Sequence, residues 1–465
     1  MGGGEVPKGF PQPNPTISYW QLPEHALAHH RTTPSLPTST TFDYVIIGSG
    51  VSGAAVAYKL LSQDPSLSVL MLEARTAASG ASGRNGGHCR AGWWLHFKKY
   101  ATAFGEDEAL KFEQLEEQNV LDIANFVKEH DVNCDFQDVE TVDAYYTEEG
   151  WAEALDVLQY RKEVSKRRPG AGRLIKRKVW HGHEAKEHLG LPHFVGAVSY
   201  PAHTQNPYLL VCKMLELGLA RGLNLQTDTP ALAVKPVAAT NEGSAGWEVD
   251  TDRGSVQAKR VVLATNAYTN ALHRGLAETG FLKPSRSQVT AIRPRTDLSE
   301  HPTQGKTVAP NDRGSGDYFL TRAPGLTGEG DIIYGGGRFI SKTREMGITD
   351  DSTVNGDIST YLKRSVPEVF GRKTWGRESV EIRDWSGITC YTPDTFPLVG
   401  EFPGEKGLFG TFGMNGHGMA MAFRSAEALV TMMRTGKEPD WFPKSFRIGR
   451  AWSKPKADLH PEQAL

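Results

Sequence analysis

Three glycines, Gly48, Gly50 and Gly53, stand at the spacing that lets a backbone pass close to a phosphate group. In such a motif the first permits a tight turn, the second lets the backbone approach a pyrophosphate, and the third lets a helix pack closely on a strand. An apolar run at 44–47 precedes the motif and a helical run at 54–61 follows it. The N-terminus of that helix would direct unpaired N–H groups at a diphosphate. The motif in this setting predicts dinucleotide binding.

Further segments extend the candidate site. Glu73 closes a second apolar run, where its carboxylate could accept hydrogen bonds from ribose hydroxyls. A loop rich in glycine and serine follows at 79–88, and its many N–H groups favour an extended cofactor, FAD, over NAD. An apolar strand ends in small residues at 264–267, and a glycine-rich turn at 410–418 opens the last helix. The candidate cofactor-binding residues are Gly48, Ser49, Gly50, Val51, Ser52, Gly53, Glu73, Ala74, Arg75, Ser82, Gly83, Arg84, Asn85, Gly86, Gly87, Ala231, Ala264, Thr265, Asn266, Gly413, Asn415, Gly416, His417, Gly418 and Met419.

Alternating apolar strands and helices must position these motifs, which indicates an α/β fold with a doubly wound, Rossmann-like part. Strands are expected at 44–47, 69–72, 247–249 and 261–263 and within 285–340. Helices are expected at about 106–130, 148–166 and 419–434. Residues 1–41 are rich in proline and predict an extended arm, which Tyr19 and Trp20 could attach to the body.

Four motifs in order carry a resemblance: GSGVSG (48–53), GASGRNGG (80–87), ATNA (264–267), and CYTPDTFPLVG (390–400) with GMNGHG (413–418). The sequence resembles the D-amino-acid-oxidase-like FAD oxidoreductases of the glycine/sarcosine oxidase type over about residues 42–435. Its second motif is most similar to the γ-glutamylputrescine oxidase branch and its fungal relatives. Asn266 departs from the glycine that many such flavoproteins carry, at a position that faces the cofactor periphery in the family.

The resemblance implies two interleaved domains. The FAD-binding domain would comprise 42–98, 200–275 and 385–436, and a substrate domain based on a β-sheet would comprise 99–199 and 276–384. Residues 437–465 would form a C-terminal tail. The resemblance also implies oxidation of a C–N bond in a small amine or amino acid by hydride transfer to flavin N5, with O2 as the acceptor and H2O2 as a product.

The candidate catalytic residues are His88, Tyr318, Arg338 and His417, with Trp93, Trp94 and Tyr391 as further pocket candidates. The N-terminus of the last helix would stabilise charge on reduced flavin, and His417 would add a side-chain donor. Relatives that bind a carboxylate partly through lysine have it where this chain has Ala420, so Arg90 or Arg338 would have to bind a substrate carboxylate. Non-covalent FAD is expected, because Arg84 stands about where some relatives carry a flavin-linked histidine.

Composition excludes several other classes. The formal net charge of −2 gives no reason to expect nucleic acid, and no apolar run is long enough for a membrane span. The four cysteines are far apart and read as free thiols, so a cytoplasmic protein is expected. Histidines at 181–193 lack the convergence of a metal site, and the basic run at 161–178 is typical of a solvated surface.

Alternatives to an oxidase are a flavin dehydrogenase or tailoring desaturase of a secondary metabolite, and a flavin-binding protein without turnover. The oligomeric state stays open.

Overall fold

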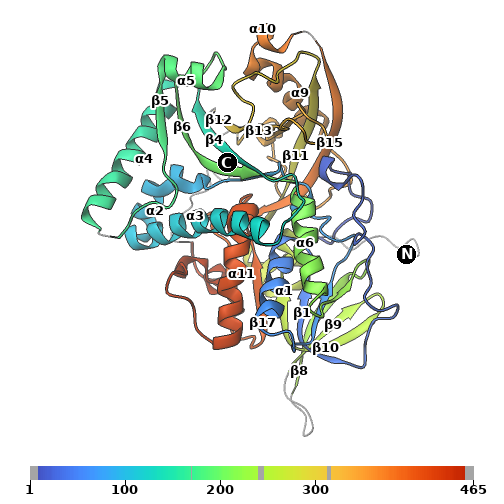
Figure 1. Ribbon diagram of the computed structural model, residues 1–465. Coiled ribbons are helices and arrows are strands. Elements are labelled where there is room, and N and C mark those ends of the chain that lie inside the picture. The colour runs from blue at the N-terminus through green and yellow to red at the C-terminus, as the bar shows by residue number, and fades with distance from the viewer. Residues whose placement is uncertain (1–8, 169, 239–245, 312–315, 377, 456–465) are drawn as a thin grey trace.

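Two sheets organise the molecule, one above the other in Figure 1. The computed structural model describes residues 9–168, 170–238, 246–311, 316–376 and 378–455. The chain alternates between the sheets, because β1–β2, β7–β10 and β16–β17 belong to the first and β3–β6 and β11–β15 to the second. This mixed α/β architecture confirms the predicted fold class.

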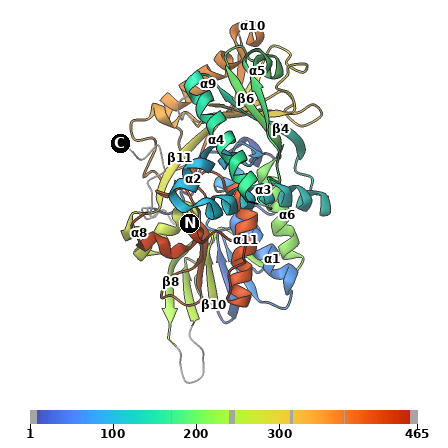
Figure 2. The same cartoon turned by 90° about the vertical axis from the view of Figure 1, so that its left-hand side faces the viewer.

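The first sheet has a parallel core in the order β17–β10–β1–β2–β7, with β16 antiparallel at one edge and a hairpin of β8 and β9 beside β10. Its strands are β1 (Thr41–Ile47), β2 (Val69–Leu72), β7 (Asn224–Gln226), β8 (Ala231–Val237), β9 (Gly246–Thr251), β10 (Gly254–Leu263), β16 (Leu398–Glu401) and β17 (Leu408–Phe412). The last residues of the inner strands β1 and β10 are apolar and buried because both faces of the sheet are covered there, as they are along β2, where all four residues are buried. The β8 hairpin extends away from the second sheet (Figure 2).

Helices α1 (Val51–Gln63), α6 (Pro207–Leu219) and α11 (Gly418–Thr435) lie beside the first sheet, and α3 (Glu106–Glu129) crosses between the two sheets (Figure 1). α1 packs against both α6 and α11, and α3 packs against α11. Small residues permit this close packing, since α1 buries Gly53, Ala54, Ala55 and Ala57. The N-termini of α1 and α11 are thereby fixed at the end of the sheet where β1 and β17 finish.

The second sheet runs in the order β15–β11–β14–β13–β12–β4–β6–β3, with β5 beside β6. Its strands are β3 (His88–Cys89), β4 (Gln137–Tyr145), β5 (Lys178–His181), β6 (Gly196–Thr204), β11 (Lys283–Pro294), β12 (Lys306–Asn311), β13 (Tyr318–Thr321), β14 (Ile332–Gly335) and β15 (Ser379–Tyr391). The remaining helices are α2 (Phe97–Phe104), α4 (Glu148–Arg167), α5 (Gly182–Leu189), α7 (Thr269–Leu272), α8 (Arg274–Thr279), α9 (Gly356–Phe370) and α10 (Arg372–Trp375). Within the ranges described, no helix has both the length and the hydropathy to cross a membrane.

The expected domain boundaries need correction where they cut continuous elements. The divisions at 98/99, 199/200, 275/276 and 384/385 fall inside α2, β6, α8 and β15. The last one matters most, because β15 pairs with β11 along its length and carries residues 385–391 in the second sheet. The interpretation of residues beyond 436 as a tail also fails for 437–455, since Phe446 is buried and its ring stacks on Phe112 with centroids 5.6 Å apart. Residues 456–465 lie outside the described part.

The N-terminal arm packs against the body from Gly9 onward. Trp20 is 2% exposed, and the phenol of Tyr19 donates to Asp331 Oδ2 at 2.8 Å. From Gly9 to Thr40 the arm consists of turns and irregular segments with one short 3-10 helix at Tyr19–Gln21, unlike the simply extended arm that its prolines predict. The two aromatic residues attach it to the body.

Candidate active site

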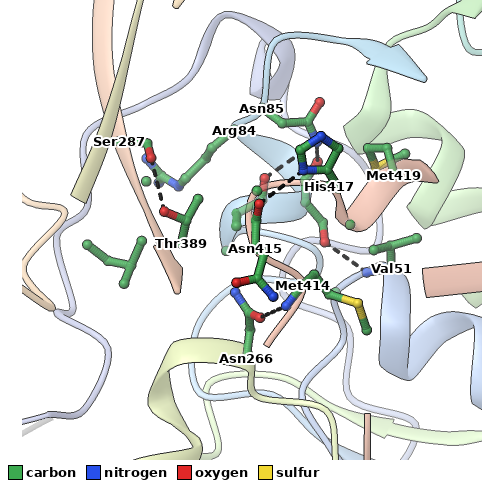
Figure 3. Close-up of a pocket in the computed structure, with 18 of the residues that line it drawn as sticks. Val51, Arg84, Asn85, Asn266, Ser287, Thr389, Met414, Asn415, His417 and Met419 are labelled. Carbon is green, nitrogen blue, oxygen red and sulfur yellow. Dashed lines mark hydrogen bonds between the residues drawn. The ribbon is translucent and has the colours of Figure 1, made fainter. Parts of the chain in front are cut away.

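One elongated cavity of about 510 Å³ receives residues from both sheets (Figure 3). At one end lie the glycine motif, Glu73 and Arg75, and at the other lie Tyr318 of β13 and the residues that follow β3 and β14. Because the helix N-termini of α1 and α11 both open into it, the cavity joins the predicted cofactor site to a candidate substrate end.

The glycine motif has the geometry that close approach requires. Gly48 has φ +102°, and a Cβ on Gly53 would lie 1.9 Å from the carbonyl oxygen of Gly48. A Cβ on Gly50 would lie 2.9 Å from Ser82 Oγ, which accepts a hydrogen bond from the Val51 amide at 2.8 Å. Within the described residues the Ser52 amide has no acceptor, and it lines the cavity. The turn therefore exposes backbone N–H to a ligand.

Glu73 holds the turn as well as facing the cavity. Its Oε2 accepts from the amide and hydroxyl of Ser49 at 3.0 and 2.6 Å, and its Oε1 accepts from the Arg75 amide at 2.9 Å. Each carboxylate oxygen can accept more than one hydrogen bond, so these contacts orient the group without preventing a ribose contact.

The turn before α11 supplies a second set of amides. The structure records no acceptor within the described chain for the amides of Gly416, Gly418 and Met419, all of which line the cavity. A helix N-terminus with free amides stabilises negative charge nearby. Asn266 fixes this turn, because its Oδ1 accepts from the amides of Gly413 and Met414 at 3.1 and 3.4 Å (Figure 3).

Asn266 itself corrects an expectation. Its side chain faces the turn and not the periphery of the site, and it also accepts from the thiol of Cys390 at 3.0 Å. Its φ of +46° is a left-handed value that glycine and asparagine tolerate best, which explains the substitution for glycine at this position.

Tyr318 lies between two glycines at the substrate end. A Cβ on Gly86 would come 2.1 Å from its ring, and one on Gly335 would come 2.3 Å from its hydroxyl oxygen. Its ring meets the His88 imidazole edge-on, with centroids 4.8 Å apart. The guanidinium of Arg338 lies 4.5 Å from the centre of the Tyr391 ring. The structure thus brings together His88, Tyr318, Arg338 and Tyr391 on one cavity wall.

His417 has a defined tautomer when neutral. Its Nδ1 lies 3.1 Å from the carbonyl oxygen of Asn415, which can only accept, so Nδ1 carries the proton. Burial, together with the positive charge of Arg90, lowers the pKa of His417 to about 4 and that of His88 to about 3. Nε2 of neutral His417 is then an acceptor, opposite to the donor role expected from the sequence.

The position of the Arg90 guanidinium is fixed by the buried carboxylate of Asp143. Its Nη1 lies 2.6 Å from Asp143 Oδ1, and Asp143 Oδ2 accepts from Trp94 Nε1 and the Tyr200 hydroxyl, both at 2.9 Å. These contacts fix the guanidinium at the cavity wall. Trp94 was expected to be a pocket residue, but it is fully buried against Asp143 and does not line the cavity.

Most predicted cofactor residues line the cavity, and five do not. Those five are Ser49, Gly53, Gly83, Gly87 and Gly413, which shape the turns that do. Arg84 reaches the wall, but its guanidinium points away and donates to Ser79 and Ser386 carbonyls at 2.6 and 3.0 Å. The sequence reasoning missed Phe10, Pro11, His96, Lys99, Tyr100, Tyr268, Ser287, Thr389, Thr395 and Met414. Of these, only His96, Lys99 and Tyr100 could have been found from the sequence, because they follow the 80–87 motif closely.

These features fit FAD. Two sets of free helix amides separated along one elongated cavity suit a dinucleotide at one end and a redox ring at the other. None of the four cysteines lines the cavity, and all four are buried, with burial raising the pKa of the Cys390 thiol to about 12.

Comparison with known proteins identifies the family. Residues 43–432 match the DAO family, described as FAD dependent oxidoreductase. The chain is 24% identical over 395 residues to the probable oxidoreductase OrdL of Haemophilus influenzae, covering 83% of this chain and 82% of that protein. It is 23% identical over 441 residues to the γ-glutamylputrescine oxidoreductase of Escherichia coli K12, covering 91% and 90%. The fold is similar to that of L-amino acid deaminase from Proteus vulgaris, with a TM-score of 0.70 at 19% identity over 92% of this chain and 99% of the other. The resemblance predicted from four motifs is confirmed, and the chain belongs to the family of FAD-dependent oxidoreductases.

Proposed function

We propose that this protein oxidises a C–N bond of a small amine or amino acid and transfers the electrons to O2, giving an imine and H2O2. The proposal rests on FAD family membership and on the charges around the substrate end of the cavity. Bound FAD would supply the hydride acceptor, at flavin N5. We infer that it is held non-covalently, mainly by the sheet that contains β1.

The charges at the substrate end carry the proposal. Three cationic residues, Arg90, Lys99 and Arg338, line it. Among the described residues that line this end, Asp317 is the one carboxylate, and it accepts from the Gly337 amide at 2.9 Å and from the Tyr334 hydroxyl at 3.2 Å. Even with Asp143 beside Arg90 counted, the cationic side chains at this end outnumber the carboxylates, so a protonated amine would meet net positive charge. Such an environment lowers the pKa of an amine and favours binding of the free base, the form that can lose a hydride.

The neighbouring side chains have separate roles in this proposal. Neutral His417 offers Nε2 as an acceptor for the substrate N–H, which orients the amine. Tyr318, immobilised between Gly86 and Gly335, closes the cavity on the other side and excludes water. Arg338 is placed to bind a carboxylate or another anionic group remote from the nitrogen, which Ala420 cannot do.

The experiment is a quantitative product assay in air. Purified holoenzyme is incubated with amines and amino acids, and H2O2 and carbonyl product are measured together. Equal amounts of both with one substrate class support the proposal. Carbonyl product that forms only with an added artificial electron acceptor would remove the oxidase part, and no product from any C–N substrate would remove the proposal itself.

A further inference from the structure

The N-terminal arm reaches the dinucleotide end of the cavity. Phe10 and Pro11 line it, and the carbonyl of Gln12 accepts from Arg75 Nη1 at 3.1 Å. Since Arg75 lies two residues after Glu73, the arm closes the cavity at the end where the ribose is expected. We call residues 10–20 the clasp.

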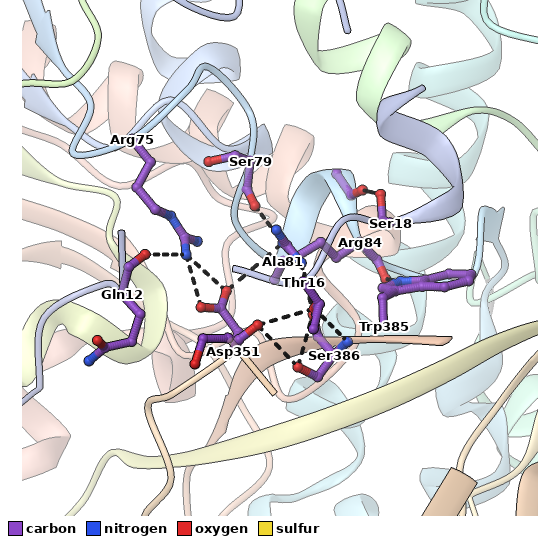
Figure 4. Close-up of polar contacts among 12 residues, drawn as sticks. Gln12, Thr16, Ser18, Arg75, Ser79, Ala81, Arg84, Asp351, Trp385 and Ser386 are labelled. Carbon is purple, nitrogen blue, oxygen red and sulfur yellow. Dashed lines mark hydrogen bonds and ion pairs between the residues drawn. The ribbon is translucent and has the colours of Figure 1, made fainter. Parts of the chain in front are cut away.

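Asp351 fastens the clasp to the body (Figure 4). Its carboxylate lies 2.9 Å from Arg75 Nη1 and 3.9 Å from Arg84 Nε, and its side chain is 1% exposed. Its backbone carbonyl accepts from the Thr16 amide at 2.8 Å. One residue of the connection before α9 thus joins the clasp to the segment 75–84 that borders the cavity.

The clasp also sets the direction of peptide groups in the 80–87 loop. The hydroxyl of Ser18 donates to the carbonyl of Gly83, and the indole Nε1 of Trp20 donates to the carbonyl of Asn85, both at 2.6 Å. Between them, Trp385 Nε1 donates to the carbonyl of Arg84 at 2.7 Å. Three successive carbonyls are therefore turned outward, two of them by the clasp.

Turning carbonyls outward turns amides inward, because the C=O of one residue and the N–H of the next are antiparallel in a planar trans peptide. Ser18 binds the carbonyl that precedes the Arg84 amide, and that amide donates to the Ala81 carbonyl at 3.2 Å. Trp385 binds the carbonyl that precedes the Asn85 amide, and Trp20 binds the one that precedes the Gly86 amide. Asn85 and Gly86 both line the cavity. In the part of the chain that the structure describes, neither amide has an acceptor. Gly86 is buried and Asn85 is half-buried, and amides in such places rarely lack a partner, so a ligand in the cavity is the expected acceptor.

We propose that the clasp is part of the FAD site: Trp20 aims the Gly86 amide at the cofactor, Ser18 holds the adjoining turn at Gly83, and Phe10 and Pro11 close the cavity behind the adenosine end. The clasp limits the rate at which FAD leaves. This role concerns cofactor retention and is independent of which amine is oxidised.

Trp20→Phe tests the proposal, because it keeps the ring and removes the donor to Asn85. Trp247→Phe is the matched control, since Trp247 Nε1 also donates to a backbone carbonyl, that of Lys406 at 3.1 Å, and Trp247 is buried away from the cavity. Loss of one such hydrogen bond changes an equilibrium by about threefold to tenfold. We expect FAD release from Trp20→Phe holoenzyme, followed by the fluorescence of freed flavin after dilution, to accelerate by that factor, and release from Trp247→Phe to match the wild type.

Ser18→Ala gives an independent test, because it removes the donor to the Gly83 carbonyl. We expect it also to accelerate release, with a fall in the urea midpoint of the FAD-free protein no larger than that of Trp247→Phe. Release rates equal to the wild type in both clasp variants would overturn the proposal. So would an equal acceleration in Trp247→Phe, which would show that any buried indole bond lowers FAD retention through general stability.

Discussion

Asn266 Oδ1 lies 3.1 Å from the amide nitrogen of Gly413, although the two residues are 147 positions apart. The contact joins the end of β10 to the turn that opens α11, so the amides that face the cavity are positioned by a residue of a different strand. The same oxygen accepts from Met414 and from Cys390. Three donors therefore depend on one side-chain atom.

We expect Asn266→Ala to destabilise the turn and weaken FAD binding. The variant leaves buried donors without an acceptor, which costs about 1–3 kcal/mol. Alanine also tolerates the left-handed φ of this position less well than asparagine does. Asn266→Gly separates the two effects, because glycine accepts the φ but still lacks the oxygen. Thermal unfolding should rank wild type above Gly and Gly above Ala. Equal melting temperatures for all three would show that the contact does not hold the turn.

Substitutions at two glycines of the first motif should affect different properties, flavin binding at Gly50 and folding at Gly53. Gly50→Val would displace Ser82 Oγ and block backbone approach to the diphosphate, so we expect a folded protein without its yellow flavin. Gly53→Ala would force a Cβ against the Gly48 carbonyl and should lower expression of folded protein. Gly172→Ala is the control, because nothing lies within 4 Å of its added Cβ. An unchanged flavin spectrum in Gly50→Val would remove that loop from the site.

Glu116 should make stability fall as the pH rises. Burial raises the pKa of Glu116 from its ordinary value of 4.5 to about 8, so the folded state holds a proton that the unfolded state has lost between these values. The free energy of unfolding therefore decreases with pH in this window, by up to about 1.4 kcal/mol per pH unit. Glu116→Gln should abolish that part of the slope, measured by urea denaturation from pH 5 to 8. Glu24→Gln, an exposed control, should retain it. Parallel curves for wild type and Glu116→Gln would contradict the buried protonated carboxyl.

Tyr318→Phe and Arg338→Ala should slow flavin reduction without releasing FAD. Removal of a hydrogen bond to a charged group costs about 1.5–3 kcal/mol, so Arg338→Ala should weaken binding of an anionic substrate by about tenfold or more and leave simple amines nearly unaffected. Stopped-flow reduction at several substrate concentrations separates affinity from the limiting rate. Tyr58→Phe, which loses a hydroxyl bonded to His130 outside the cavity, is the control. Normal kinetics in both site variants would remove these residues from the site.

The dinucleotide end was predictable because its function depends on local motifs. The glycine motif at 48–53 follows the end of β1 and opens α1, Glu73 follows the end of β2, and the 80–87 loop lies a few residues further on. Each segment can therefore be recognised from a short stretch of sequence. The clasp was not predictable in the same way, since Thr16 and Asp351 are 335 positions apart and neither belongs to a periodic pattern. The role of Asn266 was misread because the sequence shows neither its φ nor the direction of its side chain. The neutral tautomer of His417 likewise depends on one backbone carbonyl that only the folded turn brings to it.

Anaerobic reduction of the bound flavin tests the central claim most directly. Purified holoenzyme is mixed with amines and amino acids in the absence of O2, and the flavin absorbance at about 450 nm is followed. We predict that one class of C–N substrate bleaches the band and that admitting O2 restores it with release of H2O2. A flavin band that no amine or amino acid bleaches, while a substrate of another chemical class does, would contradict C–N oxidation.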